Sequence, residues 1–362
     1  MNDRMKALVE NVHAIVIINY ETWIDRLFFY FTPLRSGVFG NSAVIVTPDE
    51  KILLTSKLEV ETAQSELKEV QIYNYEHSPE FLPTLSNLLK DYPTIGLNYD
   101  GLPHSAYLTL KQLVTSHPSS HELKDLASEL AAARQIKTQE ELEKIRKACD
   151  ISTQVANEIP TYEHTDENTV AAYIEFNLRR RGATSIAFPT ISAIGPNSAD
   201  PHYTTGERPA KPGEFLLNDF GAEYTRYNAD ITRTFIFGKA DSKSRHLYEV
   251  VLQAQLEALD SIHAGVASKD VDAIARNIIN KHYPDRFIHG LGHGLGLEVH
   301  DGGRLAPSSD LFLEEGMVFT VEPGIYLRNY GGVRIEDDVV VTKDGFELLT
   351  SANKEELIEI PL

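Results

Sequence analysis

Acidic and imidazole side chains interrupt apolar, strand-like runs in the C-terminal part of this 362-residue sequence. These side chains are Asp219, Asp230, His293, Glu322 and Glu336. Burying four carboxylates without compensating charge would cost more than the ~5–15 kcal/mol stability of a typical protein. Two divalent cations would balance the four negative charges, and a bridging hydroxide would leave the cluster at about minus one. The pattern therefore predicts metal-assisted hydrolysis.

The two aspartates lie in the segment EFLLNDFGAEYTRYNADITRTFIFG, residues 214–238. It is typical of two apolar strands joined by a polar, turn-rich connection, with Asp219 near the end of one and Asp230 near the start of the next. Antiparallel pairing would bring both carboxylates to the same end of the ladder. The alternative is two ordinary turn aspartates.

The segment HGLGHGLGLEVHD, residues 289–301, combines three imidazoles with four glycines. So many glycines argue against a helix and permit a tight backbone path that brings side chains to a cavity. An isolated histidine usually has a structural role, whereas three on one glycine-rich path indicate a functional site.

The two glutamates lie in MVFTVEPGIYL (residues 317–327) and GGVRIEDDVVV (residues 331–341). A glutamate in a strand normally points to solvent. For Glu336 that alternative stays open, because strand alternation puts it on the same face as Arg334, and the two would then form an exposed ion pair of little energetic value. Asp337 and Asp338 also compete with Glu336 as the ligand. Glu322 stands between Val321 and a Pro-Gly turn, which makes a solvent-exposed position less plausible.

Composition excludes several classes of protein. The net charge of −19 and the pI of about 5.1 disfavour nucleic-acid and anionic-membrane partners. Cys149 is the only cysteine, so an intrachain disulfide is excluded and a reducing, cytoplasmic location is expected. The apolar run HAIVIIN, residues 13–19, is far shorter than the ~20 residues that span a bilayer, and we interpret it as a core strand.

The elements that must position these residues fall into two predicted domains. Residues 1–125 alternate β-rich runs with amphipathic stretches, which indicates an α/β domain, and SAVIVTPDEKILLTS (residues 42–56) predicts a hairpin. Helical periodicity starts at about residue 122, residues 126–138 form a linker or helix, and Thr138 with Glu141 predicts a capping box that restarts a helix. Residues 139–362 then give helices followed by strands and glycine-rich turns, an α+β domain.

Taken together, the motifs NDFGAEY, DITRTF, HGLGHGLGLEVHD, TVEPGIY and GGVRIEDD resemble the M24 "pita-bread" metallopeptidases, and specifically the Xaa-Pro peptidases, prolidase and aminopeptidase P. The resemblance covers about residues 139–362, and the first domain is more loosely similar to the creatinase-type N-terminal domain. Arg226 and Ala229 stand where relatives often have Gly and Ser, but neither departure removes a ligand. The resemblance implies a creatinase-like α/β domain followed by an α+β pita-bread catalytic domain.

The resemblance also implies roles for individual residues. Two divalent ions per subunit, Mn²⁺ or Co²⁺, would be held by the five residues named above, with Glu322 also shuttling a proton and a metal-bridging hydroxide as the nucleophile. Arg334 would support a ligand carboxylate. The family's substrate-contacting histidines correspond to His202, His289 and His300, although His202 is also compatible with a surface loop.

The substrate class follows from the resemblance: a peptide bond preceding proline. Arg304 favours an Xaa-Pro dipeptidase, because a guanidinium can pair with the free carboxylate of a dipeptide, although a solvated loop arginine is the alternative. Aminopeptidase P, acting on longer peptides, is the main competing function. The extra N-terminal domain argues against a methionine aminopeptidase, and the complete ligand set argues against a non-catalytic interaction module. A homodimer is expected from the resemblance.

Overall fold

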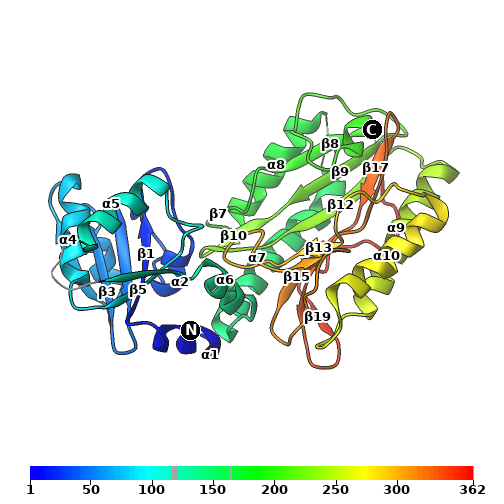
Figure 1. The fold of residues 1–362 in the computed structure, drawn as a ribbon. Helices are drawn as coiled ribbons and strands as arrows, with labels where there is room; N and C mark the ends of the chain where they lie inside the picture. Colours follow the sequence, from blue (N-terminus) through cyan, green and yellow to red (C-terminus); the bar gives the residue numbers. More distant parts are fainter. Residues whose placement is uncertain (116–120, 163–164, 362) are drawn as a thin grey trace. The chain divides into compact units, whose positions relative to one another are not determined.

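The computed structural model describes residues 1–115, 121–162 and 165–361, and the chain divides into two compact units (Figure 1). The first unit comprises Met1–Arg134 and the second Gln135–Leu362. All residues singled out as candidate ligands lie in the second unit.

The first unit is a six-stranded mixed sheet in the order β4-β3-β2-β1-β5-β6, covered by helices on both faces. Its strands are β1 (Ala14–Asn19), β2 (Ser42–Val46), β3 (Lys51–Ser56), β4 (Gln71–Tyr75), β5 (Thr94–Leu97) and β6 (Glu122–Asp125). Its helices are α1 (Asp3–Glu10), α2 (Leu27–Phe31), α3 (Val60–Glu66), η1 (Ser78–Glu80), α4 (Phe81–Leu89), α5 (His104–Thr115) and α6 (Ala127–Gln135).

The central strand β1 shows why this sheet needs two layers of helices. Ile15 and Ile17 belong to one apolar core with residues of α1, α2, α3 and α6, whereas Val16 and Ile18 belong to another with α4 and α5. Successive side chains of a strand point to opposite faces, so an uninterrupted apolar run requires cover on both. The expected α/β character of this region is confirmed.

Two sequence predictions have different outcomes here. The predicted hairpin is confirmed, since β2 and β3 pair antiparallel and Thr47 N–H donates to Glu50 O at 3.0 Å. The helix predicted from about residue 122 is wrong at its start, because Glu122–Asp125 forms β6, parallel to β5. The side chains of β6 are mostly exposed and polar, so the strand carries no apolar alternation, and backbone pairing at the sheet edge determines its conformation.

The second unit contains several small sheets and four long helices. Its strands are β7 (Ser185–Ile186), β8 (Ile191–Ile194), β9 (Phe215–Phe220), β10 (Ala222–Tyr224), β11 (Tyr227–Asn228), β12 (Ile231–Phe237), β13 (Gly292–His293), β14 (Arg304–Leu305), β15 (Val318–Val321), β16 (Gly324–Leu327), β17 (Gly331–Arg334), β18 (Asp337–Val341), β19 (Phe346–Leu348) and β20 (Glu359–Ile360). Its helices are α7 (Gln139–Glu158), η2 (Ile159–Thr161), α8 (Glu167–Arg180), η3 (Gly195–Ala199), α9 (Ser242–Asp260) and α10 (Ser268–His282).

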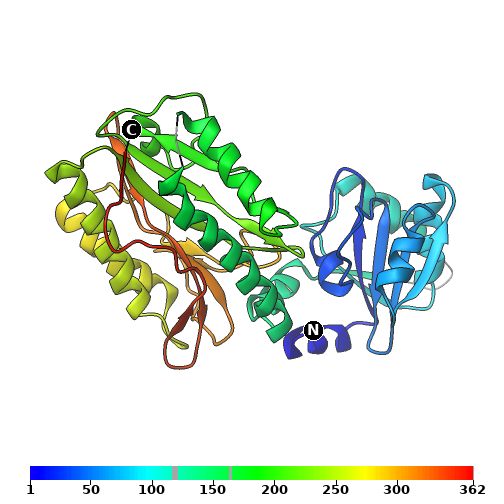
Figure 2. The ribbon, with the colours of Figure 1, turned by 180° about the vertical axis from the view of Figure 1, so that it is seen from behind.

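The helices form two pairs around these strands. Helices α7 and α8 lie side by side in Figure 2, and α9 with α10 forms the other pair. The latter pair packs its buried aliphatic side chains against strands β15 to β18. The predicted capping box is confirmed: Thr138 accepts from the Glu141 N–H, and Glu141 accepts from the Thr138 N–H at 2.9 Å. This cap begins α7 where the second unit begins.

Both glutamates lie at places where the chain passes from one sheet to another. Glu322 falls between β15 and β16, and Glu336 between β17 and β18, so the expectation that each sits within a strand is wrong. β15 pairs with β18, while β16 pairs with β17 in a separate ladder. The ladder hydrogen bonds are interrupted at each glutamate, and the interruption turns a carboxylate inward.

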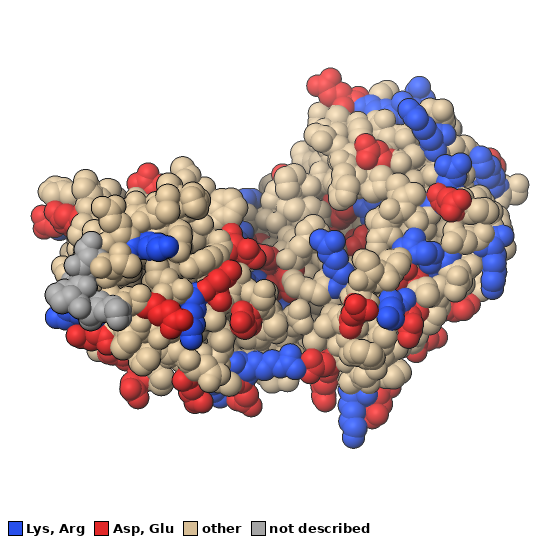
Figure 3. Space-filling view, in the orientation of Figure 1, with Lys and Arg blue, Asp and Glu red and all other residues tan. Residues whose placement is uncertain are grey.

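The surface carries charges of both signs. Figure 3 shows acidic side chains distributed over the face that it draws, interspersed with lysine and arginine. Among the described residues, none of the helices combines the length and apolar character required to cross a membrane.

Candidate metal centre

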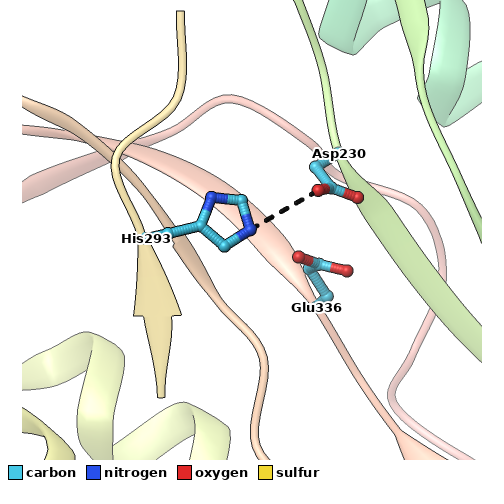
Figure 4. A group of neighbouring side chains, drawn as sticks. All are labelled: Asp230, His293 and Glu336. Atoms are coloured by element: carbon cyan, nitrogen blue, oxygen red, sulfur yellow. Dashed lines mark ion pairs between the residues drawn. The ribbon is translucent and has the colours of Figure 1, made fainter. Parts of the chain in front are cut away.

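Asp230, His293 and Glu336 form the centre of the site (Figure 4). Each offers one ligand atom, and these atoms all lie within 4.8 Å of one another. His293 Nε2 is 3.7 Å from Asp230 Oδ2. Asp230 directly precedes β12, His293 lies in β13 and Glu336 directly precedes β18, so segments distant in the sequence converge here.

Glu322 and Asp219 extend this group on either side. Glu322 Oε1 lies 3.4 Å from His293 Nε2. Asp219, on β9, is opposite Thr232 of β12 in the antiparallel ladder, and Thr232 Oγ1 donates to Glu336 Oε2 at 2.6 Å. The structure therefore groups Asp230, His293 and Glu336, with Glu322 beside His293. Asp219 is near enough for its charge to raise the pKa of Asp230 and Glu336.

The carboxylates of the cluster repel one another in a buried position. Burial, followed by the charges of neighbouring carboxylates, raises the pKa of Asp230 and of Glu336 well above its usual value. Burial also raises the pKa of Glu322 to about 8. Burial lowers the pKa of His293 to about 3, which leaves its imidazole neutral and able to donate a lone pair. This environment favours a bound cation.

Two buried carboxylate oxygens show whether the residues of this site suit a divalent metal ion. Asp219 Oδ1 and Asp230 Oδ1 have no hydrogen-bond partner among the described residues. A buried carboxylate oxygen without a partner is costly, whereas a divalent cation satisfies several such atoms at once. Four carboxylates with one imidazole make an oxygen-rich donor set that suits hard or borderline divalent ions. The residues present fit a divalent metal centre.

Three hydroxyl groups that the sequence analysis missed contact the site: two orient predicted ligands, and the third contacts His289. Thr320 Oγ1 donates to Glu322 Oε1 at 3.2 Å and accepts from the His293 N–H at 3.1 Å. Thr232 Oγ1 donates to Glu336 Oε2 at 2.6 Å, and the Tyr326 hydroxyl is 2.8 Å from His289 Nε2. Thr320 stands two residues before its partner Glu322, whereas Thr232 is 104 residues from its partner Glu336, a contact that only the strand pairing brings about.

Arg334 lies inside the site. It donates to Asp219 Oδ2 at 2.6 Å, to Thr232 Oγ1 at 3.0 Å and to the Tyr326 hydroxyl at 3.0 Å. The alternative of an exposed pair with Glu336 is wrong, because Arg334 is 3% exposed and Glu336 is 2% exposed. Arg334 thus contacts a carboxylate of the cluster and the hydroxyls around it.

The two aspartates that follow Glu336 have other contacts. Asp337 accepts from Arg233 at 2.7 Å and from Lys354 at 2.6 Å, which makes a buried structural ion-pair network. Asp338 Oδ2 accepts from the Asp230 N–H at 2.9 Å and lies 3.3 Å from the sulfur of Cys149. Asp337 therefore belongs to a separate ion-pair network, and Asp338 binds the backbone of Asp230. Glu336 is the carboxylate that lies in the cluster.

The predicted substrate-contacting histidines surround the cluster. His289 is largely buried, and its Nδ1 is 3.9 Å from Glu322 Oε2. The His300 ring meets the His293 ring edge-to-face, with centroids 4.2 Å apart, and is exposed. His202 is also exposed; its charge adds to the effect of burial in lowering the pKa of both His289 and His300, so it lies near both.

This fold and this site define a metallopeptidase. Residues 143–343 match Metallopeptidase family M24, and residues 10–136 match the Creatinase/Prolidase N-terminal domain. The chain belongs to metallopeptidase family M24.

Named relatives are similar over nearly the whole chain. The Xaa-Pro dipeptidase of Pyrococcus furiosus is 37% identical over 358 residues, covering 96% of this chain and 99% of the relative. Among solved structures, the Xaa-Pro dipeptidase from Bacillus anthracis has a TM-score of 0.89 at 31% identity, covering 99% of this chain and 98% of that one. The X-Pro aminopeptidase from Thermotoga maritima has the same TM-score and identity, covering 99% and 100%.

These comparisons confirm the resemblance and the fold class, a creatinase-type N-terminal domain followed by a pita-bread catalytic domain. The protein is a hydrolase, and its family uses divalent metal ions. The alternative of a non-catalytic interaction module is set aside.

Proposed function

We propose that this protein is an Xaa-Pro dipeptidase, a prolidase, that hydrolyses the bond before proline with two divalent cations, Mn²⁺ or Co²⁺. Asp219, Asp230, His293, Glu322 and Glu336 would hold the ions. The observation that carries the proposal is the convergence of these side chains with two buried carboxylate oxygens left without partners. The names of the similar dipeptidases support the substrate class.

When bound, the two cations would acidify a water molecule and polarise the scissile carbonyl. Glu322 lies at the edge of the cluster, between His293 and His289. That position suits a residue that takes a proton from water and passes it to the departing proline nitrogen. His300 and His202 would donate hydrogen bonds to the substrate carbonyl as negative charge develops on it. His289 donates its Nδ1 proton to the Gly290 carbonyl at 2.8 Å and its Nε2 lies 2.8 Å from the Tyr326 hydroxyl, so it would line the substrate site without donating to the carbonyl.

Arg304 supports the preference for dipeptides. It is exposed at the site margin, in β14, where it pairs with His293 of β13. A dipeptide places its free carboxylate one residue beyond the scissile bond, and a guanidinium can bind that carboxylate with two parallel hydrogen bonds. A longer peptide has an amide at the same place and would gain less.

Aminopeptidase P activity is the second candidate function. The observation that favours it is the structural similarity to the X-Pro aminopeptidase, whose TM-score equals that of the Bacillus anthracis dipeptidase. The fold therefore does not discriminate between the two substrate lengths. The contact that discriminates is the proposed one between Arg304 and the C-terminal carboxylate.

Kinetics on matched substrates test the proposal. The protein is treated with chelator, reloaded with Mn²⁺ or Co²⁺, and assayed on Leu-Pro and on Leu-Pro-Ala. We expect metal-dependent hydrolysis with a higher kcat/KM on the dipeptide. A clear preference for the tripeptide would favour the aminopeptidase, and hydrolysis of Leu-Ala at an equal rate would contradict proline specificity.

Homodimeric assembly and a cytoplasmic location stay predictions. Light scattering coupled to size-exclusion chromatography measures the first, and cell fractionation measures the second.

A further inference from the structure

Glu167, at the start of α8, is a fully buried carboxylate outside the metal centre, with 0% of its surface exposed. Its two oxygens accept hydrogen bonds from a single stretch of chain, residues 194–208. Oε1 accepts from the Ile194 N–H and from Asn197 Nδ2, both at 2.8 Å. Oε2 accepts from the Tyr203 hydroxyl at 2.9 Å, the Gly206 N–H at 3.2 Å and the Arg208 N–H at 3.4 Å.

All five donors are neutral groups. Among the residues that the structure describes, no lysine or arginine forms an ion pair with the Glu167 carboxylate, and the nearby Arg208 guanidinium pairs with Glu214 instead, at 2.6 Å. A buried carboxylate of this kind is stabilised by the donors themselves and by the positive end of the helix that it begins. If any of these donors moves away, the buried carboxylate loses a hydrogen bond, which is costly. The Glu167 carboxylate therefore restrains residues 194–208.

His202 lies between these anchored points. Tyr203, its direct neighbour, donates to Glu167 and accepts from Asn197 Nδ2 at 2.8 Å, which closes a triangle of hydrogen bonds. The His202 N–H donates to Asp200 Oδ1 at 3.2 Å. The backbone on either side of His202 is therefore held, while its imidazole stays exposed. Its charge acts on His289 and His300, to a smaller extent than burial, in lowering their pKa values.

We propose that Glu167 is a positioning residue: it holds the 194–208 segment so that the His202 imidazole faces the substrate. This inference rests on the proposed function, since it takes His202 as a substrate contact. Glu167 itself touches neither substrate nor metal ligand. Its effect on turnover passes through His202.

The test uses Glu167→Gln in the full-length, Mn²⁺-loaded protein. Glutamine keeps the shape, but its amide nitrogen replaces one acceptor and faces donors. We expect kcat/KM on Leu-Pro to fall by about 10- to 100-fold, because small displacements of catalytic groups have effects of this size. The bound Mn²⁺ per subunit, measured by elemental analysis, should stay at the wild-type value.

A double-mutant cycle with His202→Ala shows whether the effect passes through the imidazole. We expect Glu167→Gln to cause little further loss in the His202→Ala background. An equal loss in both backgrounds would overturn the inference. If His202→Ala is impaired while Glu167→Gln is normal, only the inference fails; if His202→Ala has wild-type kinetics, the role of His202 fails and the inference with it.

Two further variants separate positioning from stability. Asp166 is the adjacent N-cap of α8 and accepts from the Thr169 N–H at 2.9 Å. Asp166→Ala weakens the same helix start without removing an acceptor from the 194–208 donors, so we expect wild-type kcat/KM per folded molecule. If Glu167→Gln does not fold, Tyr203→Phe removes two bonds of the triangle, those to Glu167 and from Asn197, and wild-type kinetics in that variant would overturn the inference.

Discussion

Arg304 lies directly opposite His293 in the two-stranded β13–β14 ladder. This pairing places an exposed guanidinium next to the metal centre, and its positive charge contributes, after burial and His300, to the lowered pKa of His293. Among the described residues, no carboxylate lies within 4.0 Å of the Arg304 guanidinium. A cationic group without an acidic partner beside a catalytic centre is placed to receive an anionic group of the substrate.

Replacing Arg304 with alanine should therefore affect dipeptides most. A charge-assisted hydrogen-bonded contact contributes about 1.5–3 kcal/mol, so we expect kcat/KM on Leu-Pro to fall by about 10- to 100-fold and that on Leu-Pro-Ala to fall less. Arg328→Ala, which removes another exposed arginine, is the matched control. Equal losses on both substrates would count against carboxylate capture.

Asp230→Asn should abolish turnover while the fold persists. Loss of an outer-shell partner typically costs ~10–100-fold, and a direct ligand should cost at least about 100-fold. Because the substitution removes one charge from a repelling cluster, the metal-free variant should unfold at a higher urea concentration than the metal-free wild type. Turnover at the wild-type rate would refute the ligand assignment.

The raised pKa of Glu322 should make the metal-free protein lose stability as the pH rises, whereas the lowered pKa values of His289 and His293 act in the opposite direction below about pH 6.5. The pKa of Glu322 is raised from 4.5 to about 8 in the folded state, so the folded protein binds this proton more tightly than the unfolded chain does. The resulting stabilisation is complete below about pH 4.5 and is lost as the pH rises towards 8. The shifts of Asp230 and Glu336 have the same direction.

Urea denaturation of chelator-treated protein at pH 5 and pH 8 measures this effect. Mn²⁺ should restore stability at pH 8, and Glu322→Gln should reduce the difference between the two pH values in metal-free protein. An identical pH dependence of the free energy of unfolding in metal-free wild type and metal-free Glu322→Gln would contradict the raised pKa of Glu322.

The turn between β10 and β11 predicts a stabilising substitution. Thr225 and Arg226 form a two-residue loop with φ of +45° and +74°, a region that β-branched residues rarely adopt. Asparagine tolerates this region, so Thr225→Asn should raise the free energy of unfolding by about 1 kcal/mol. Thr225→Val keeps the branched side chain, and an equal gain from that variant would attribute the effect to loss of the hydroxyl instead.

The positive φ of Arg226 also explains one departure noted in the sequence. The resemblance described in the sequence analysis implies glycine at this position, and glycine is the residue that adopts such a conformation without a steric cost. The sequence showed the departure, but only the backbone shows why glycine suits this place.

The candidate ligands could be picked out because charge within apolar runs is costly and therefore informative. Asp219, Asp230 and His293 were identified on that basis, and the structure brings them together with both glutamates. Thr232 and Thr320 could not be identified in the same way, because threonine is an ordinary strand residue and its partner is known only when strands pair. Sequence alone shows the anions but not the hydroxyls that orient them.

The missed features of the fold have a related cause. Glu122–Asp125 is a strand only because β5 offers its edge. The connections at Glu322 and Glu336 depend on which strand each neighbour pairs with. These are long-range choices that local residue patterns do not record.

The most direct test of the account is metal stoichiometry measured together with activity. Chelator-treated protein is titrated with Mn²⁺ while bound metal and Leu-Pro hydrolysis are followed in the same samples. We expect negligible hydrolysis without metal and recovery that is complete at two ions per subunit. Full hydrolysis by protein shown to be metal-free would contradict the central claim that these five side chains act through bound cations.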